Sequence, residues 1–154
     1  MSKTYGLAGL RIGWIATQDR AFFDQVAALK DYTTICNSAP SEFLAELALR
    51  HRHQIAERNL NLIRHNLTVL EAFFARHTDL FAWQRPVAGP IAFPRLLGRD
   101  VEDFCHDVVT NASVLLVPGT IYDHGLNHFR VGFGRRNLPE AVAQLDSYLA
   151  QRRA

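Results

Sequence analysis

Apolar residues recur at three- and four-residue spacing through much of the chain, which is the pattern of helices with one buried face. The first such stretch begins at Arg20 and fades at residues 30–32, and Asp19 is placed to cap it. A much longer stretch covers about residues 41–76. It exceeds the roughly 8–20 residues of an ordinary globular helix, so we expect it to bend or to connect two bodies, with any break near residues 59–61.

Shorter apolar runs predict strands at residues 10–16, 91–97, 113–117 and 128–133. The run at 113–117 is apolar from Val114 onward, which is typical of a buried strand. Pro94 marks the run at 91–97 as an edge or interrupted strand, because proline cannot donate a hydrogen bond to a ladder.

Two further helical patterns occupy the second half of the chain. Asp100 is placed to cap the first, and Asn137 opens the second through a box-like cap with Glu140. Their apolar faces comprise Val101, Phe104, Cys105, Val108 and Val109 in one, and Val142, Leu145, Tyr148 and Leu149 in the other. From about residue 40 onward, the pattern therefore predicts an α+β domain in which a small antiparallel or mixed sheet packs on helices.

Composition narrows the class of protein. The chain has 154 residues, 48% hydrophobic and 21% charged, and a net charge of +2, which is too small to indicate a nucleic-acid partner. No apolar run approaches the roughly 20 residues of a membrane span. Cys36 and Cys105 form no disulfide or zinc pattern, and the seven histidines show no ligand spacing, so we expect no metal and a reduced, cytoplasmic setting. Trp14 and Trp83 are interpreted as core residues.

One lysine stands in a glycine-punctuated segment at the start of the chain, Ser2-Lys3-Thr4-Tyr5-Gly6-Leu7-Ala8-Gly9-Leu10-Arg11-Ile12-Gly13. A lysine amine becomes a nucleophile and a base when desolvation or a nearby cation lowers its pKa. The planar guanidinium of Arg11 suits a two-pronged contact with phosphate. Gly6, Gly9 and Gly13 are interpreted as backbone requirements, since glycine permits positive φ and close approach.

This segment resembles the lysine signature of the class I/II (fold type I) aminotransferases, which use pyridoxal 5'-phosphate. The resemblance implies that Lys3 holds the cofactor aldehyde covalently and later moves a proton between the substrate Cα and the cofactor C4′. It implies that Arg11 anchors the cofactor phosphate, with Ser2 as a second candidate for the same phosphate.

A second segment, Val117-Pro118-Gly119-Thr120-Ile121-Tyr122 followed by Phe129-Arg130-Val131-Gly132-Phe133, resembles another motif of the same family. In that family the arginine binds the α-carboxylate of the substrate, so the resemblance implies that role for Arg130. The chemistry agrees, because a fork-shaped donor matches a carboxylate and fixes the Cα–H bond relative to the cofactor. A solvated arginine on a strand is the competing interpretation.

The resemblance also implies a domain organisation. The parent fold is an α/β three-layer enzyme, and this chain corresponds to its C-terminal portion. Residues 1–40 would be a remnant of the large cofactor-binding domain, 41–78 a long linking helix, and 79–154 the small C-terminal α+β domain. The large domain supplies further groups that hold the cofactor ring, so we expect this chain alone to transaminate poorly or not at all.

The implied reaction moves an amino group between an amino acid and a 2-oxo acid, in an enzyme that is a homodimer and binds neither nucleic acid nor membrane. Two further interpretations stay open. The same lysine and arginines serve pyridoxal-phosphate-dependent lyases and cyclases of this fold. The chain could also be a non-catalytic aminotransferase-like domain.

Overall fold

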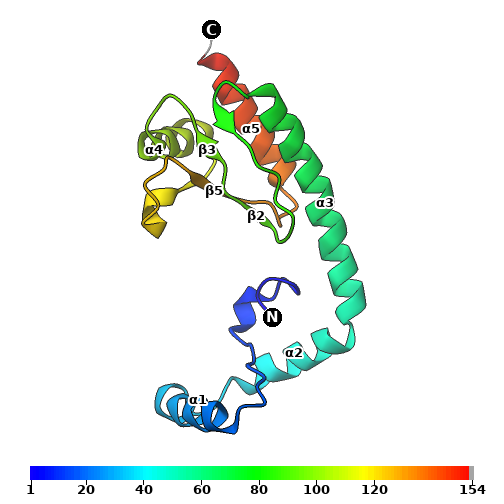
Figure 1. Ribbon diagram of the computed structural model, residues 1–154. Helices are drawn as coiled ribbons and strands as arrows, with labels where there is room; N and C mark the ends of the chain where they lie inside the picture. Colours follow the sequence, from blue (N-terminus) through cyan, green and yellow to red (C-terminus); the bar gives the residue numbers. More distant parts are fainter. Residues whose placement is uncertain (153–154) are drawn as a thin grey trace. The chain divides into compact units, whose positions relative to one another are not determined.

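The computed structural model of the chain describes residues 1–152. The chain forms two compact units, Met1–Asn59 and Leu60–Ala154, and the boundary between them falls within helix α3 (Arg52–Arg76). Helices and short strands are combined in the second unit (Figure 1), so the predicted α+β class is confirmed. The division at residues 40 and 78 stays a prediction, and its last range ends outside the described residues.

The first unit contains helices α1 (Arg20–Thr33) and α2 (Ala39–Arg50). The predicted cap of α1 is confirmed, because the Asp19 carboxylate accepts a hydrogen bond of 3.1 Å from the backbone N–H of Phe22. This bond satisfies one of the donors that the first turn of a helix leaves without a partner. Pro40 lies in the first turn of α2, where its missing N–H costs nothing.

The strand predicted at residues 10–16 is wrong. Ala8–Leu10 form a short 3-10 helix, η1, and residues 11–18 have no regular secondary structure. A strand needs a neighbour that pairs its N–H and C=O groups, and in the described part of the chain no segment pairs with this one. Trp14 is 63% exposed, which also contradicts its assignment to the core.

The long helical stretch predicted at residues 41–76 is interrupted, as its length led us to expect, because α2 ends at Arg50 and α3 begins at Arg52. His51 lies outside both helices with φ −99° and ψ 20°. Residues 50–54 are all polar, so no apolar side chain stabilises a continuous helix at this turn. The break therefore precedes the predicted position at residues 59–61, where α3 is uninterrupted.

Short antiparallel strands form the sheets of the second unit. Strand β1 (Phe81–Ala82) pairs with β3 (Arg95–Leu96), while β5 (Phe129–Gly132) lies between β2 (Ile91–Ala92) and β4 (Val117–Pro118). A bridge between Arg95 and His128 continues the pairing of β5 beyond its first residue. Strand β5 is thus hydrogen-bonded on both sides.

Two of the predicted strands form only in part. Residues 91–97 split into β2 and β3 at Phe93 and Pro94, so the interrupted strand is confirmed. Only Val117 of the predicted buried strand at 113–117 belongs to a ladder. Val114 and Leu116 are buried but Leu115 is 76% exposed, so this segment alternates between core and solvent.

Helices α4 (Val101–Ala112) and α5 (Leu138–Gln151) follow the predicted patterns. The Asp100 carboxylate caps α4 by accepting from the N–H groups of Glu102 and Asp103. Asn137 forms no side-chain cap on α5, contrary to prediction, because its φ of −87° and ψ of 18° depart from the extended backbone of a capping residue.

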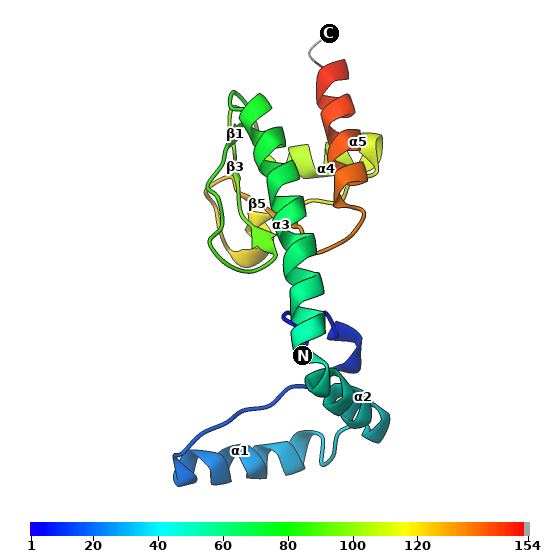
Figure 2. The ribbon, with the colours of Figure 1, turned by 90° about the vertical axis from the view of Figure 1, so that its right-hand side faces the viewer.

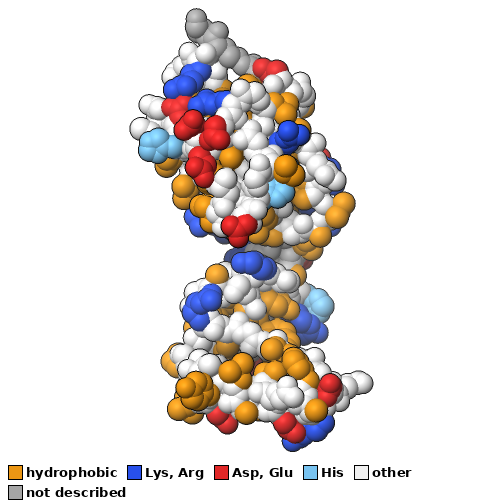
Figure 3. Space-filling view, turned by 60° about the vertical axis from the view of Figure 1, so that its left-hand side comes forward, with side chains coloured by type: hydrophobic (Ala, Val, Ile, Leu, Met, Phe, Trp, Pro, Cys, Tyr) orange, Lys and Arg blue, Asp and Glu red, His pale blue; other side chains and the backbone are white. Residues whose placement is uncertain are grey.

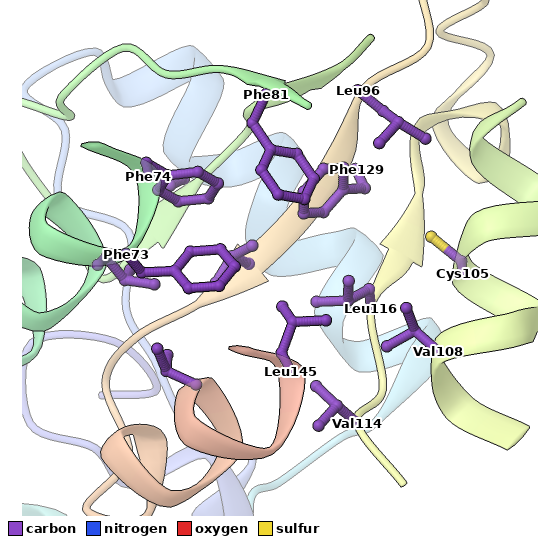
Figure 4. Close-up of a cluster of buried hydrophobic side chains, with 14 of the residues drawn as sticks. Phe73, Phe74, Phe81, Leu96, Cys105, Val108, Val114, Leu116, Phe129 and Leu145 are labelled. Carbon is purple, nitrogen blue, oxygen red and sulfur yellow. The ribbon is translucent and has the colours of Figure 1, made fainter. Parts of the chain in front are cut away.

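The core of the second unit is an aromatic cluster with aliphatic side chains around it (Figure 4). The ring of Phe81 lies 5.5–5.8 Å from rings of α3, α4 and β5, which belong to Phe73, Phe74, Phe104 and Phe129. Figure 2 shows the strands beside α3, and α4 contacts α5. Trp83 stacks on Phe74 with ring centroids 4.3 Å apart, in agreement with its predicted core position. Val109 is 38% exposed, although it was predicted to face the core.

Candidate functional site

Lys3 lies in a tight turn that backbone and side-chain hydrogen bonds hold. The Lys3 carbonyl accepts from the N–H of Gly6 at 3.1 Å, and the Asn59 side chain donates to the carbonyl of Thr4 at 2.9 Å. The Lys3 side chain is exposed, and among residues 1–152 its amine forms no hydrogen bond or ion pair. The turn therefore presents an amine that is available to a ligand.

Gly6 is the glycine of this segment that the backbone requires. Its φ is +67°, in the left-handed region that side chains disfavour, and an added Cβ would lie 3.6 Å from Nδ2 of Asn59. Gly9 and Gly13 have no positive φ, and a Cβ on either would meet nothing within 4 Å. The prediction that the backbone requires glycine at these two positions is therefore wrong for this chain.

Arg11 follows η1 in the left-handed conformation, with φ 51°. Its backbone N–H and its Nη1 both contact the Ala8 carbonyl, the latter at 3.1 Å. The guanidinium is exposed and keeps four of its five N–H donors for other partners. Ser2 is half-buried in the same unit. The first unit thus holds three of the predicted site residues, and the fourth, Arg130, belongs to the second unit.

Arg130 lies on the middle strand of its sheet, opposite Val117 of β4. Phe129 and Val131 are buried, so Arg130 points to the other face of the sheet, where it is half-buried. Its Nη1 donates a hydrogen bond of 2.9 Å to the hydroxyl of Tyr122. None of the ion pairs among the described residues involves Arg130.

Aromatic and imidazole rings surround this face, and sequence reasoning missed them. His128 stacks on Phe93 at 5.2 Å, and its Nδ1 lies 3.1 Å from Nε2 of His124. Phe93 also meets Tyr122 edge-on at 6.4 Å. Burial lowers the pKa of His128, and the neighbouring His124 and Arg95 lower it further. The four-residue spacing of the histidines is visible in the sequence, but their contact with Phe93 depends on strand pairing.

Gly119 allows its own backbone to lie close to the His128 carbonyl, next to the start of β5. An added Cβ would lie 2.8 Å from the His128 carbonyl oxygen and 3.0 Å from Cζ of Phe93. The Gly119 N–H donates to the same carbonyl at 2.7 Å. The short 3-10 helix η2 (Gly119–Tyr122) starts here and carries Tyr122 to Arg130. Only glycine fits this close backbone contact.

Two half-buried carboxylates of the second unit join its helices. Asp107 of α4 accepts from the Tyr148 hydroxyl of α5, and this bond, with further bonds from Arg99, Arg152 and Asn111, holds the Asp107 pKa below its usual range. Asp146 bonds to His77 and Arg76 at 2.6 Å each, and the bond from His77 chiefly lowers the Asp146 pKa. Both networks join helices of the second unit to one another.

Two surface hollows of the second unit are lined by other residues than the predicted site residues. One is lined by α4 and α5 residues such as Asn111 and Ser147, and the other by Trp83, Arg85 and neighbours. Neither of these two hollows is lined by Lys3, Arg11 or Arg130. Among the residues that the structure describes, no acidic, histidine or cysteine cluster could hold a metal ion, and no helix is long and apolar enough to cross a membrane.

The chain is similar to known enzymes along nearly its whole length. The family model "Aminotransferase class I and II" matches residues 1–145. Capreomycidine synthase of Streptomyces vinaceus is 31% identical over 153 residues, which are 97% of this chain and 39% of that enzyme.

Two solved structures have the same fold. A PLP-dependent aminotransferase from Streptococcus suis is 32% identical with a TM-score of 0.87, covering 97% of this chain and 40% of that one. The PLP-dependent cyclase OrfR is 33% identical with a TM-score of 0.86, covering 98% and 42%. This chain therefore spans about two fifths of the length of these relatives. The match over residues 1–145 shows that the chain belongs to the aminotransferase class I and II family.

Proposed function

We propose that the protein acts with pyridoxal phosphate to transfer an amino group between an amino acid and a 2-oxo acid. Lys3 holds the cofactor and moves the proton, Arg11 binds the cofactor phosphate with Ser2 beside it, and Arg130 binds the substrate carboxylate. The observation that carries this proposal is the turn of Lys3. Hydrogen bonds donated by Gly6 and Asn59 hold this turn, and its exposed amine forms no hydrogen bond within residues 1–152.

The donor set fits the cofactor at two points. An aldehyde needs a primary amine, and a phosphate needs cationic or N–H donors. Lys3 supplies the first, and the exposed guanidinium of Arg11 supplies the second. Lys30 is the other lysine of the chain, and its Nζ is bonded to Thr34 and Asn37 at 3.1 Å each.

The residues of this chain then divide the work. When bound, the cofactor withdraws electrons from the substrate Cα. The amine of Lys3 would accept the Cα proton and return a proton at C4′. Arg130 holds the carboxylate with parallel N–H donors and so orients the Cα–H bond. Arg11 fixes the far end of the cofactor through its phosphate.

Selective modification of Lys3 tests the proposal. The chain is incubated with pyridoxal phosphate, reduced with borohydride, digested and analysed by mass spectrometry. We expect the label on Lys3, with loss in Lys3→Ala and no loss in the matched control Lys30→Ala. Arg11→Gln should lower labelling by pyridoxal phosphate about three- to tenfold, and leave labelling by phosphate-free pyridoxal unchanged. Equal labelling of both lysines would contradict the role of Lys3.

A cyclase or lyase reaction is the second candidate, and the 33% identity to a PLP-dependent cyclase favours it over a non-catalytic domain. The same lysine and arginine would serve, because transamination and cyclisation both begin with removal of the Cα proton. The distinction requires a longer polypeptide that contains these residues. Amino exchange between an amino acid and a 2-oxo acid supports the transaminase, whereas a cyclic product or an eliminated fragment supports the cyclase or lyase. A non-catalytic domain would label neither lysine selectively.

We also infer a homodimer. The first unit exposes large apolar side chains, among them Tyr32 at 92% and Ile35 at 75%, and such surfaces in a folded protein are typical of contacts with another chain. Sedimentation equilibrium checks this inference, with twice the mass of one chain expected and a single-chain mass contradicting it.

A further inference from the structure

The hydroxyl of Tyr122 has an unused donor next to Arg130. Its oxygen accepts a hydrogen bond of 2.9 Å from Nη1 of Arg130, so its own proton is free to be donated elsewhere. Within residues 1–152 this hydroxyl donates to no other group, and the ring is 48% exposed. The guanidinium keeps four N–H groups after this bond.

Both groups stand on well-supported backbone. Strand β5 pairs on either side, with β2 and with β4. Tyr122 ends η2, where the N–H of Asp123 bonds to Thr120 and the N–H of His124 bonds to Gly119. The edge-on contact with Phe93 fixes the ring further. Hydrogen bonds therefore hold the backbone of both residues, and the 2.9 Å bond joins the hydroxyl to the guanidinium.

The charge at this point is not balanced by the protein. Arginines 20, 50, 76, 85, 99 and 152 pair with carboxylates, whereas Arg130 is in none of the ion pairs of the described residues and bonds to a neutral phenol. A carboxylate can accept about four hydrogen bonds, and a guanidinium fork fills two of these positions. A hydroxyl beside the fork can fill a third.

We propose that Tyr122 is a substrate-binding residue, whose hydroxyl accepts from Arg130 and donates a third hydrogen bond to the carboxylate that Arg130 binds. The inference rests on the proposed role of Arg130. The hydroxyl of Tyr122 is a neutral donor, so it distinguishes a carboxylate from an uncharged ester less strongly than Arg130 does. Its bond with Arg130 aligns the guanidinium toward the carboxylate.

A titration of the whole chain with pyruvate tests this proposal. The ring Cζ of Tyr122 and the guanidinium Cζ of Arg130 are observed by carbon-13 NMR, and methyl pyruvate, which lacks the carboxylate charge, is the comparison probe. We expect pyruvate to shift both signals. Tyr122→Phe keeps the ring and its contact with Phe93, and should weaken pyruvate binding about three- to tenfold. Tyr32→Phe, which removes the hydroxyl of a 92% exposed tyrosine in the first unit, should change nothing.

The outcomes separate the role of Tyr122 from that of Arg130. If Arg130→Lys weakens pyruvate binding and Tyr122→Phe does not, the role of Tyr122 is overturned and that of Arg130 stands. If Arg130→Lys leaves pyruvate binding unchanged, or methyl pyruvate binds as well as pyruvate, the carboxylate site itself is overturned. Weakening by both variants, for pyruvate alone, supports the proposal.

Discussion

The two units differ in how much apolar surface they bury. In the second unit, Phe104, Phe129 and Phe133 are at most 1% exposed and belong to one continuous core. In residues 1–59, all of which the structure describes, the buried residues are Ala45 and Ala48. Figure 3 shows apolar side chains on the surface, and the exposed ones of the first unit are Trp14, Ile15, Phe22, Phe23, Leu29, Tyr32, Ile35, Phe43, Leu44 and Leu47.

This difference indicates what each unit depends on. Burial of apolar surface is the main favourable term in folding, at about 25 cal/mol per Å², so the second unit is stabilised by its own residues. The first unit depends more on local hydrogen bonds, such as the Asp19 cap and the bond from Asn59 to Thr4. The proposed carboxylate site therefore has a stable scaffold, while Lys3 and Arg11 lie on a segment without a core of its own.

The largest expected effect comes from removing one buried ring. Phe104→Ala in α4 should lower the free energy of unfolding by about 3–5 kcal/mol, because it leaves a cavity in the core. Phe43→Ala in α2, where the ring is 67% exposed, should change it by less than about 0.5 kcal/mol. Urea unfolding followed by Trp83 fluorescence, in a Trp14→Phe background, measures the second unit alone.

Amide hydrogen exchange provides the matching measurement for the first unit. Phe104→Ala should speed exchange in α4 and α5 far more than Phe43→Ala speeds it in α2. Similar losses for the two variants would contradict the contrast between the units.

A smaller effect is expected from two asparagines of α3. The fully buried Asn66 donates to the carbonyls of Phe133 and Arg135 at 2.9 and 2.7 Å, and so attaches the end of β5 to the helix. Asn66→Ala should cost about 2–3 kcal/mol, because buried acceptors lose their donor. Asn59→Ala removes the exposed bond to Thr4 and the exposed bonds that Asn59 accepts from Arg58, and should cost about 0.5–1.5 kcal/mol.

Exchange rates separate the two asparagine variants. Asn59→Ala should raise the exchange of the Gly6 amide in the Lys3 turn, whereas Asn66→Ala should act on the amides of β5. An Asn66→Ala variant with unchanged urea midpoint would show that α3 does not hold β5 in place.

The sequence predicts best those features that depend on neighbouring residues. The caps at Asp19 and Asp100 were found because a cap is a local arrangement of one carboxylate and nearby N–H groups. The strand predicted at residues 10–16 does not form, because a strand exists only with a partner. Similarly, α2 ends at the polar run 50–54, which contains no glycine or proline from which the end of a helix could be predicted.

The candidate site divides in the same way. Lys3, Arg11 and Arg130 were identified from motifs, and their roles stay predictions. Tyr122 and His128 were not identified as part of the site, since their contacts with Arg130 and Phe93 arise from the folding of the chain and not from a local pattern. The requirement for Gly119 likewise depends on the His128 carbonyl, which no motif reveals.

Two glycines extend the comparison to the backbone. Gly119→Ala should destabilise the second unit by about 1–3 kcal/mol, because the new Cβ would lie 2.8 Å from a backbone oxygen at the start of β5 and force a shift. Gly9→Ala in η1 meets open space, and should stabilise the first unit by about 0.4–1 kcal/mol through loss of unfolded-state freedom. Urea midpoints for Gly119→Ala and exchange in residues 1–18 for Gly9→Ala check the opposite signs.

The smallest expected effect is on the stability of the second unit at acidic pH. The bond from His77 holds the Asp146 pKa below that of an ordinary carboxyl, so this group stabilises the second unit above the unfolded pKa of about 3.9. That stabilisation is lost as pH falls through the lower, folded pKa. The pKa of His128 is also lowered, so the folded chain favours its neutral form. The stability of the second unit therefore falls in the same direction, with falling pH, but at higher pH values than for Asp146.

Asp146→Asn should therefore reduce the dependence of the unfolding free energy on pH below about pH 4. The effect is modest, because the Asp146 side chain is 34% exposed and solvent screens it. Asp24→Asn in α1 is the matched control, because its carboxylate pairs with Arg20 on an open surface, with side chains 58% and 81% exposed. If Asp24→Asn flattens the pH dependence as much as Asp146→Asn does, the acid sensitivity does not arise from the bond between α5 and His77, and the two units differ less in their electrostatics than in their cores.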